Sequence, residues 1–89
     1  MPRYYFHLYD GYGRSPDPDG RELASLDIAR AQALKGARSV ICEDVRHGRV
    51  DLTGRIEVLD ERGDPVLTLR FRDAVELIVD ETDRAGGAA

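Results

Sequence analysis

The chain has almost no cysteine, since Cys42 is the only one among its 89 residues. A single thiol excludes an intrachain disulfide framework and any zinc site built from several cysteines. Long apolar runs are missing too, because no segment approaches the roughly 20 apolar residues that a membrane-spanning helix needs. His7 and Asp10 interrupt the opening segment, which therefore lacks the apolar stretch of a signal peptide. We expect a protein of the reducing cytoplasm that does not contact a membrane.

Lysine is equally scarce: Lys35 is the single lysine, and the other 12 of the 13 basic residues are arginines. The 17 acidic residues outnumber them, so the formal net charge is -4 and the average field repels phosphate backbones. Arginine suits two-pronged contacts with carboxylates and phosphates. Arginines spaced among Asp and Glu are nevertheless more typical of a solvated surface whose charges neutralise one another. Nucleic-acid binding is disfavoured, although a local basic patch would still permit it.

Motifs for catalysis, metal binding or cofactor binding are missing as well. The segment Asp17-Pro18-Asp19-Gly20 superficially matches a calcium-binding loop, but the register would put Leu26 where a bidentate glutamate is needed. Cys42 lacks a suitable base, because His47 is five residues further along a predicted helix. Paired carboxylates lie in predicted turns and would face solvent, whereas an acid catalyst needs burial. We expect no enzyme activity, no metal and no cofactor.

The composition that remains is typical of one small folded domain. Its residues are 42% hydrophobic and 34% charged, far from the composition of disordered chains. A chain of this length buries only about 60–65% of the surface that its unfolded form exposes, which allows a single core. We expect one domain over residues 1–79. Residues 80–89, which end in small side chains, are predicted to form a flexible tail.

An aromatic strand is predicted over residues 4–9. Because side chains alternate along a strand, one face would carry Tyr4, Phe6 and Leu8, and the other Tyr5, His7 and Tyr9. Residues 10–13 are predicted to form a turn. Two prolines within residues 15–20 exclude both a helix and a central strand there. Only a short strand over residues 21–24 is expected before the helix.

A long helix is predicted from Leu26 to about His47, with Ser25 as its N-cap. At about 100° per residue its apolar side chains fall in one stripe, which comprises Leu26, Ala29, Ala33, Leu34, Ala37, Val40, Ile41 and Val45. The alanines would let the helix approach a sheet closely. Arg30 and Asp44 fall in the same stripe and are expected to reach out to the rim of the core.

Two further strands, residues 55–60 and 66–71, are predicted to form a hairpin with Gly63 in its turn. Five apolar side chains of this hairpin should face the core: Ile56, Val58, Leu67, Leu69 and Phe71. Residues 72–79 suit either a helical turn or a strand, and we favour a short helix. The predicted fold is an α+β two-layer sandwich, a small antiparallel β-sheet of three to four strands with one long helix packed across it.

Several segments resemble a family of short bacterial proteins that is catalogued as a domain of unknown function. They are the opening Met-Pro-Arg-Tyr-Tyr-Phe-His, Asp19-Gly20 with Glu22-Leu23, Ala29-Arg30-Ala31, Gly54-Arg55-Ile56-Glu57-Val58 and the closing Leu69-Arg70-Phe71-Arg72-Asp73-Ala74-Val75. The resemblance covers roughly residues 1–78 and implies no catalytic or ligand residues, since none is established for the family. The order of elements is also similar to that of small antitoxin-type domains, although fold likeness alone does not license a shared function.

Tyr5, His7 and Tyr9 are the first candidate surface, because a strand would place them in one row on one face. Three interpretations remain open. A loop or the C-terminal segment would half cover this face, with His7 hydrogen-bonded. Alternatively the face binds a partner or a second copy, since aromatic anchors dominate interfaces. In the third interpretation it stacks nucleic-acid bases, as aromatic sheet faces do in single-strand binders.

The sequence therefore predicts a non-catalytic protein-interaction or self-association module, a homodimer that uses this aromatic face. The alternative is a nucleic-acid-binding regulator of antitoxin type, in which the same strand would act together with Arg3, Arg14, Arg46 and Arg49. Salt distinguishes the two hypotheses. Contacts to phosphates weaken steeply as salt rises, whereas an apolar or aromatic interface changes little.

Overall fold

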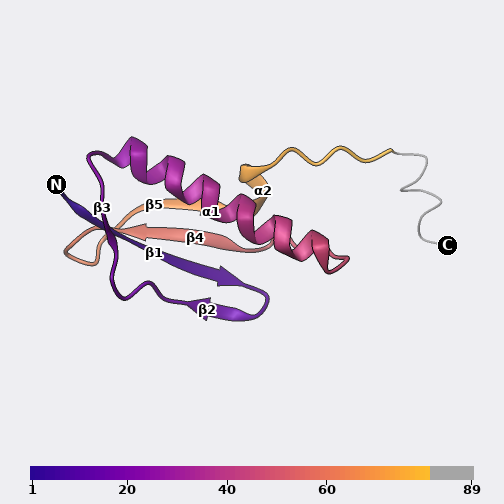
Figure 1. The fold of residues 1–89 in the computed structure, drawn as a ribbon, viewed down its shortest axis with the longest axis horizontal. Helices are drawn as coiled ribbons and strands as arrows, with labels where there is room; N and C mark the ends of the chain where they lie inside the picture. The colour runs from indigo at the N-terminus through magenta and orange to yellow at the C-terminus, as the bar shows by residue number, and fades with distance from the viewer. Residues whose placement is uncertain (81–89) are drawn as a thin grey trace.

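The computed structural model describes residues 1–80, which form two layers (Figure 1). The elements follow in the order β1 (Arg3–Asp10), β2 (Gly13–Ser15), β3 (Arg21–Glu22), α1 (Leu26–Arg46), β4 (Arg55–Leu59), β5 (Pro65–Arg70) and α2 (Phe71–Ala74). One layer is an antiparallel sheet and the other is α1, which lies across one sheet face. The predicted α+β two-layer fold is confirmed. Neither helix within residues 1–80 has the length and apolar content to cross a bilayer. The tail predicted for residues 80–89 lies, apart from Asp80, outside the described residues.

The sheet has the strand order β2-β1-β4-β5, and β3 pairs with the other end of β1. Along one edge, β1 thus meets β2 at Leu8 to Asp10 and β3 at Arg3 and Tyr4. The two short strands act as one edge strand that is interrupted over residues 16–20. The sequence does not predict β2, because three residues are too few to show alternation. The short strand predicted over residues 21–24 forms, but only over Arg21–Glu22.

The side chain of Asp17 closes the interruption in this edge strand. Its carboxylate accepts hydrogen bonds from the backbone N–H groups of Phe6 and Gly20, both at 3.1 Å. The backbone N–H of Asp17 in turn donates to Nδ1 of His7 at 3.0 Å. Prolines on either side of Asp17 have no N–H and cannot continue a strand ladder. The carboxylate therefore takes the place of the missing strand as the partner of β1.

Replacing Asp17 with alanine is expected to lower the free energy of unfolding by about 1–3 kcal/mol, because the half-buried N–H of Phe6 loses its acceptor. Urea denaturation followed by circular dichroism measures this loss. Asp19→Ala is the matched control, since Asp19 is exposed and contributes its backbone carbonyl, which accepts from Arg3. Equal losses for the two variants would show that the Asp17 carboxylate does not hold the edge.

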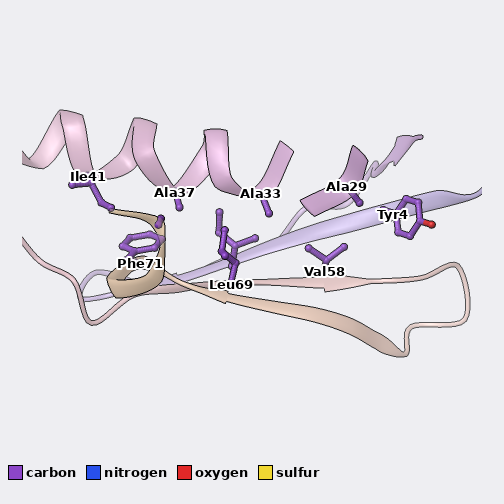
Figure 2. Packing of buried hydrophobic residues seen from close by; sticks show 10 residues of the cluster. Tyr4, Ala29, Ala33, Ala37, Ile41, Val58, Leu69 and Phe71 are labelled. Atoms are coloured by element: carbon purple, nitrogen blue, oxygen red, sulfur yellow. The ribbon is translucent and has the colours of Figure 1, made fainter. Parts of the chain in front are cut away.

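Small side chains let α1 pack closely on the sheet (Figure 2). Its buried residues are Ala29, Ala33, Ala37 and Ile41. As predicted, Ser25 caps the helix, and its side chain accepts from the N–H of Ile28 at 3.3 Å. The predicted stripe is too long at both ends, because Leu26 and Val45 are 42% and 52% exposed. They lie in the first and last turns of the helix, where its packing against the sheet ends.

The sheet and α2 supply the larger core side chains (Figure 2). Phe71 and Val58 are the largest fully buried residues, and Tyr4, Ile56 and Leu69 complete the core around them. Of the hairpin residues predicted to face the core, Leu67 alone is only half-buried. The N–H of Phe71 donates to the carbonyl of Gly54 at 2.9 Å, which continues the β4–β5 ladder into the start of α2.

The short helix predicted over residues 72–79 is wrong in its extent. α2 spans only Phe71–Ala74, and Val75 is already extended, with φ -139° and ψ 155°. Nε of Arg38 donates to the carbonyl of Ala74 at 2.8 Å and ties the end of this turn to α1. The residues that follow include three β-branched side chains, which favour an extended backbone over a helix. Residues 75–80 therefore leave the domain without forming a helix or a strand (Figure 1).

Candidate binding face of the sheet

The sheet face opposite α1, here called the open face, is not covered by a helix within residues 1–80 (Figure 1). Its side chains form three rows that cross the strands. The arginine row consists, in order of pairing, of Arg14, Tyr9, Arg55 and Arg70. The middle row consists of His7, Glu57 and Thr68, and the apolar row of Tyr5, Leu59 and Pro65. Tyr5, His7 and Tyr9 thus share one face, and each belongs to a different row.

Tyr9 lies between two arginines of the arginine row. Cζ of Arg55 is 4.1 Å from the centroid of the Tyr9 ring, and Cζ of Arg14 is 5.8 Å from it. Nε of Arg55 also lies 3.6 Å from Oε2 of Glu57, and Nε of Arg70 lies 3.1 Å from Oδ2 of a nearby aspartate, residue 73. Exposed cation–π contacts are worth about 0.5–1 kcal/mol each, enough to align the guanidinium groups. The arginine row is therefore a band of planar cationic groups whose charge these two carboxylates partly neutralise.

His7 and Tyr5 are both tied to the interrupted edge strand. Because Nδ1 of His7 accepts from the N–H of Asp17, the neutral imidazole carries its proton on Nε2. The Tyr5 ring packs against Gly20, where an added Cβ would lie 2.8 Å from Cε2 of Tyr5. Both side chains are half-buried. The interpretation of a half-covered face with a hydrogen-bonded histidine therefore describes these two residues, while Tyr9 is held by arginines.

A second contact between arginine and tyrosine lies beside the β1–β2 turn. Cζ of Arg49 is 5.5 Å from the Tyr12 ring centroid, and its Nη2 lies 3.2 Å from Oδ2 of Asp51. The hydroxyl and the N–H of Thr53 donate to Oδ1 of Asp51 at 2.6 and 3.0 Å. These hydrogen bonds, and then the charge of Arg49, hold the pKa of Asp51 below its usual range. The carboxylate stays ionised and anchors Arg49 at this end of the sheet.

The arginines predicted as nucleic-acid contacts do not form one patch. Arg3 lies at the start of β1, where its guanidinium pairs with Glu22 at 3.2 Å. Arg46 lies in the last turn of α1, 3.8 Å from a glutamate of the same helix. Only Arg14 and Arg49 lie by the β1–β2 turn, each over a tyrosine ring. The structure thus brings only two of the four predicted arginines together, and three of the four, Arg3, Arg46 and Arg49, are paired with a carboxylate.

The sequence analysis did not identify Arg55 and Arg70 as members of the open face. It also missed Tyr12 as the ring that contacts Arg49 at the β1–β2 turn. Strand alternation was a usable signal for Arg55, because it precedes the predicted core residue Ile56 and so belongs to the opposite face. Alternation cannot show which residues of different strands are neighbours. Only the pairing register places Arg55 between Tyr9 and Arg70.

A groove of about 450 Å³ lies between α1 and the interrupted edge strand. Its polar lining includes Asp17, Arg21, Gln32 and Lys35, and Nη1 of Arg21 donates to Oε1 of Gln32 at 2.8 Å. Among residues 1–80 no group of three His, Cys, Asp or Glu side chains is placed to hold a metal ion. Cys42 is exposed on α1. The contacts between arginine and tyrosine side chains lie on the open face and at the β1–β2 turn, and not in this groove.

These observations define a small α+β two-layer sandwich with one sheet face under a helix and the other face open. The chain belongs to the family described as Domain of unknown function (DUF6894), whose model matches residues 3–72. The predicted membership in a family of unknown function is confirmed. No curated protein and no solved structure matches the chain. The matched region includes every strand and α1 and ends within α2, so residues 75–80 follow it.

Proposed function

We propose that the protein is a non-catalytic protein-interaction module of the bacterial cytoplasm that binds its partner through the open face. The observation that carries the proposal is the arginine row, in which three arginines and one tyrosine are in register across four strands. Tyrosine and arginine are the side chains most enriched among interface anchors. The single exposed thiol, Cys42, fits a reducing compartment.

The three rows of the open face specify the chemistry of the partner. A carboxylate can replace Glu57 as the neighbour of Arg55, and an arginine fork binds a carboxylate through two parallel hydrogen bonds. The apolar row begins with Tyr5, four residues along β1 from Tyr9, which is about 13 Å on an extended strand. The best complement is therefore a protein surface that presents an acidic side chain and an apolar one about 13 Å apart.

Three features favour a protein over a nucleic acid as the partner. The Tyr9 ring already carries Arg55 at 4.1 Å, so this aromatic face is not free to stack a base. Glu57 places a negative charge in the middle row of the same face. The net charge of -4 also opposes the approach of a phosphate backbone.

The alternative function is a nucleic-acid-binding regulator of antitoxin type. One observation favours it: Arg14 and Arg49, both predicted as contacts, lie by the β1–β2 turn over Tyr9 and Tyr12. Arg55 adds a third cation on the other side of Tyr9. Binding by these groups would release counterions and fall steeply with rising salt.

A displayed peptide library, selected on the wild-type protein, tests the proposal. Enriched peptides are expected to combine Asp or Glu with an apolar residue, and to bind the Arg55→Glu variant about tenfold more weakly or worse, a loss of about 1.4 kcal/mol. Arg30→Glu is the matched control, because Arg30 is also exposed but lies on α1, in the other layer. Peptides without acidic residues, or equal binding to both variants, would refute the open face as the binding surface.

The same proteins also test the alternative function. A fluorescent single-stranded oligonucleotide is expected to show no binding at physiological salt. The purified protein should show the low ratio of absorbance at 260 to 280 nm that is typical of a protein without bound nucleic acid. Because the chain has no Trp and only 4 Tyr, even traces of nucleic acid would raise this ratio visibly. Oligonucleotide binding that high salt removes, and that Arg55→Glu or Arg49→Glu abolishes, would instead establish the regulator.

A further inference from the structure

Residues 75–79, here called the C-terminal arm, carry three consecutive exposed aliphatic side chains. Leu77, Ile78 and Val79 are 62%, 83% and 51% exposed. The arm leaves the domain at the end of α2 and continues in the direction of β5 (Figure 1). Its Val and Ile side chains favour an extended, strand-like backbone. Contiguous exposed apolar side chains of this kind are typical of a surface that contacts another molecule.

An apolar groove of about 430 Å³, here called the end groove, lies at the opposite end of the molecule. Its lining comprises Pro2, Tyr4, Leu26, Val66 and the hairpin residues Asp60, Glu61 and Arg62. Leu26 and Val66 are 42% and 36% exposed, so part of its apolar wall is open to solvent. The arm cannot fill the end groove of its own chain, because it points away from the hairpin (Figure 1). A second chain is needed to bring an arm to this groove.

Pairing along the outer edge of β5 would bring the C-terminal arm of one copy to the end groove of another. The hydrogen bond from Phe71 to Gly54 fixes the phase of the β4–β5 ladder. Because bonded and non-bonded pairs alternate in an antiparallel ladder, Leu69 directs its backbone groups toward β4. Thr68 and Arg70 direct theirs to the outside, where the described chain supplies no neighbouring strand.

The two edges of the sheet are protected to different degrees. Natural proteins block edge strands with prolines, charges and interruptions. The β2/β3 edge has an interruption, with Pro16, Pro18 and the inserted carboxylate of Asp17. β5 has no proline or charged residue between Val66 and Thr68, its only proline, Pro65, opens the strand, and its register shift against β4 lies at this first end, opposite Val58 and Leu59. An edge left open in this way is available for pairing.

We propose that a second copy of the chain pairs with β5 antiparallel about Thr68, and that each C-terminal arm lies in the end groove of the other copy. This register places Thr68 opposite Thr68, Leu67 opposite Leu69, and Val66 opposite Arg70 of the second copy. The arm of the second copy follows Arg70 by a single turn, α2, and so starts beside Val66 of the first. The four extended residues from Val75 to Ile78 reach about 13 Å, which carries Ile78 along the end groove.

The contact obeys the rule for a two-fold dimer, because both copies use the same surface and each contact occurs twice. It differs from the self-association predicted from the sequence, which used Tyr5, His7 and Tyr9. Here the open face stays free, and the proposed partner binding does not depend on the dimer. The two proposals can therefore fail separately.

Light scattering of the full chain after size exclusion tests the dimer. The wild type is expected to be a dimer whose mass does not change with salt. The double variant Leu77→Asp, Ile78→Asp should be monomeric, with dimer affinity lower by about 30-fold or more. The control is Val45→Asp, Val50→Asp, because these aliphatic residues are 52% and 53% exposed and lie outside the arm and the end groove. A monomeric wild type, or a dimer that the arm substitutions leave intact, would overturn the proposal.

Disulfide trapping tests the register independently of affinity. In a Cys42→Ser background, Ile78→Cys and Leu26→Cys are made as separate proteins, then mixed and oxidised. A cross-linked species containing one chain of each kind is expected, and far less cross-linking when either protein is oxidised alone. Absence of the mixed species would exclude the arm from the end groove. If Arg55→Glu dissociated the dimer, the open face would be the self-association surface and this proposal would be wrong.

Discussion

Replacing Phe71 with alanine is expected to destabilise the domain by about 3–5 kcal/mol, the usual cost of removing a buried aromatic ring. Phe71 is 1% exposed and is one of the two largest fully buried side chains. It lies at the junction of β5, α2 and α1, and its ring packs against Gly54, where an added Cβ would meet Cε2 of Phe71 at 2.7 Å. Loss of the ring would therefore leave a cavity at this junction.

A domain of this size has a total stability of only about 4–12 kcal/mol, so the loss removes a large part of it. Urea denaturation followed by circular dichroism measures the change, and an unfolded variant without denaturant would count as the same result. Val50→Ala serves as the control, since Val50 is 53% exposed and should change the stability by about 0.5 kcal/mol or less. A loss for Phe71→Ala that matches the control would mean that this junction is not the centre of the core.

Replacing Gly20 with alanine is expected to cost about 2–5 kcal/mol and to disturb the open face. The residue has φ +68°, a left-handed conformation that costs a residue with a Cβ about 1–2 kcal/mol. The new methyl group would also lie 2.9 Å from the carbonyl oxygen of Tyr4 and 2.8 Å from the Tyr5 ring. Because the Tyr4 carbonyl belongs to β1, relief requires a shift of the Tyr5 side chain or of the edge, which adds about 1–3 kcal/mol.

Gly63 provides the matched control for this substitution. It has φ +84°, and a Cβ added to it would meet nothing within 4 Å. Gly63→Ala should therefore show the conformational cost alone, about 1–2 kcal/mol. Chemical denaturation of both variants gives the difference, and the NMR signals of the Tyr5 ring should shift only for Gly20→Ala. Equal stabilities would show that the contact between Gly20 and Tyr5 does not constrain the edge.

The two proposed surfaces have a common geometric consequence. Pairing of β5 with β5 of a second copy continues the sheet, so both α1 helices lie on one side and both open faces on the other. A partner with two acidic segments could then engage two arginine rows at once, and avidity would raise its affinity without any new contact. If the dimer does not form, the open face of the monomer still presents one complete arginine row.

The sequence by itself determined the fold class and the division of β1 into two faces. Alternation placed Tyr4 in the core and Tyr5, His7 and Tyr9 together on the other face, and a stripe of alanines located the side of α1 that packs on the sheet. These features follow from the periods of two residues in a strand and 3.6 in a helix, which short segments reveal without knowledge of their neighbours.

Only the tertiary structure decided how the edge closes, which arginines gather and where the last helix ends. Asp17 bonds to β1 across eleven residues of chain, and Arg14, Tyr9, Arg55 and Arg70 align only through strand register. Register depends on pairing between distant segments, which no local period encodes. The helix predicted over residues 72–79 ends at Ala74 because packing stabilises a single turn there. Beyond that turn, no packing offsets the extended preference of the residues that follow.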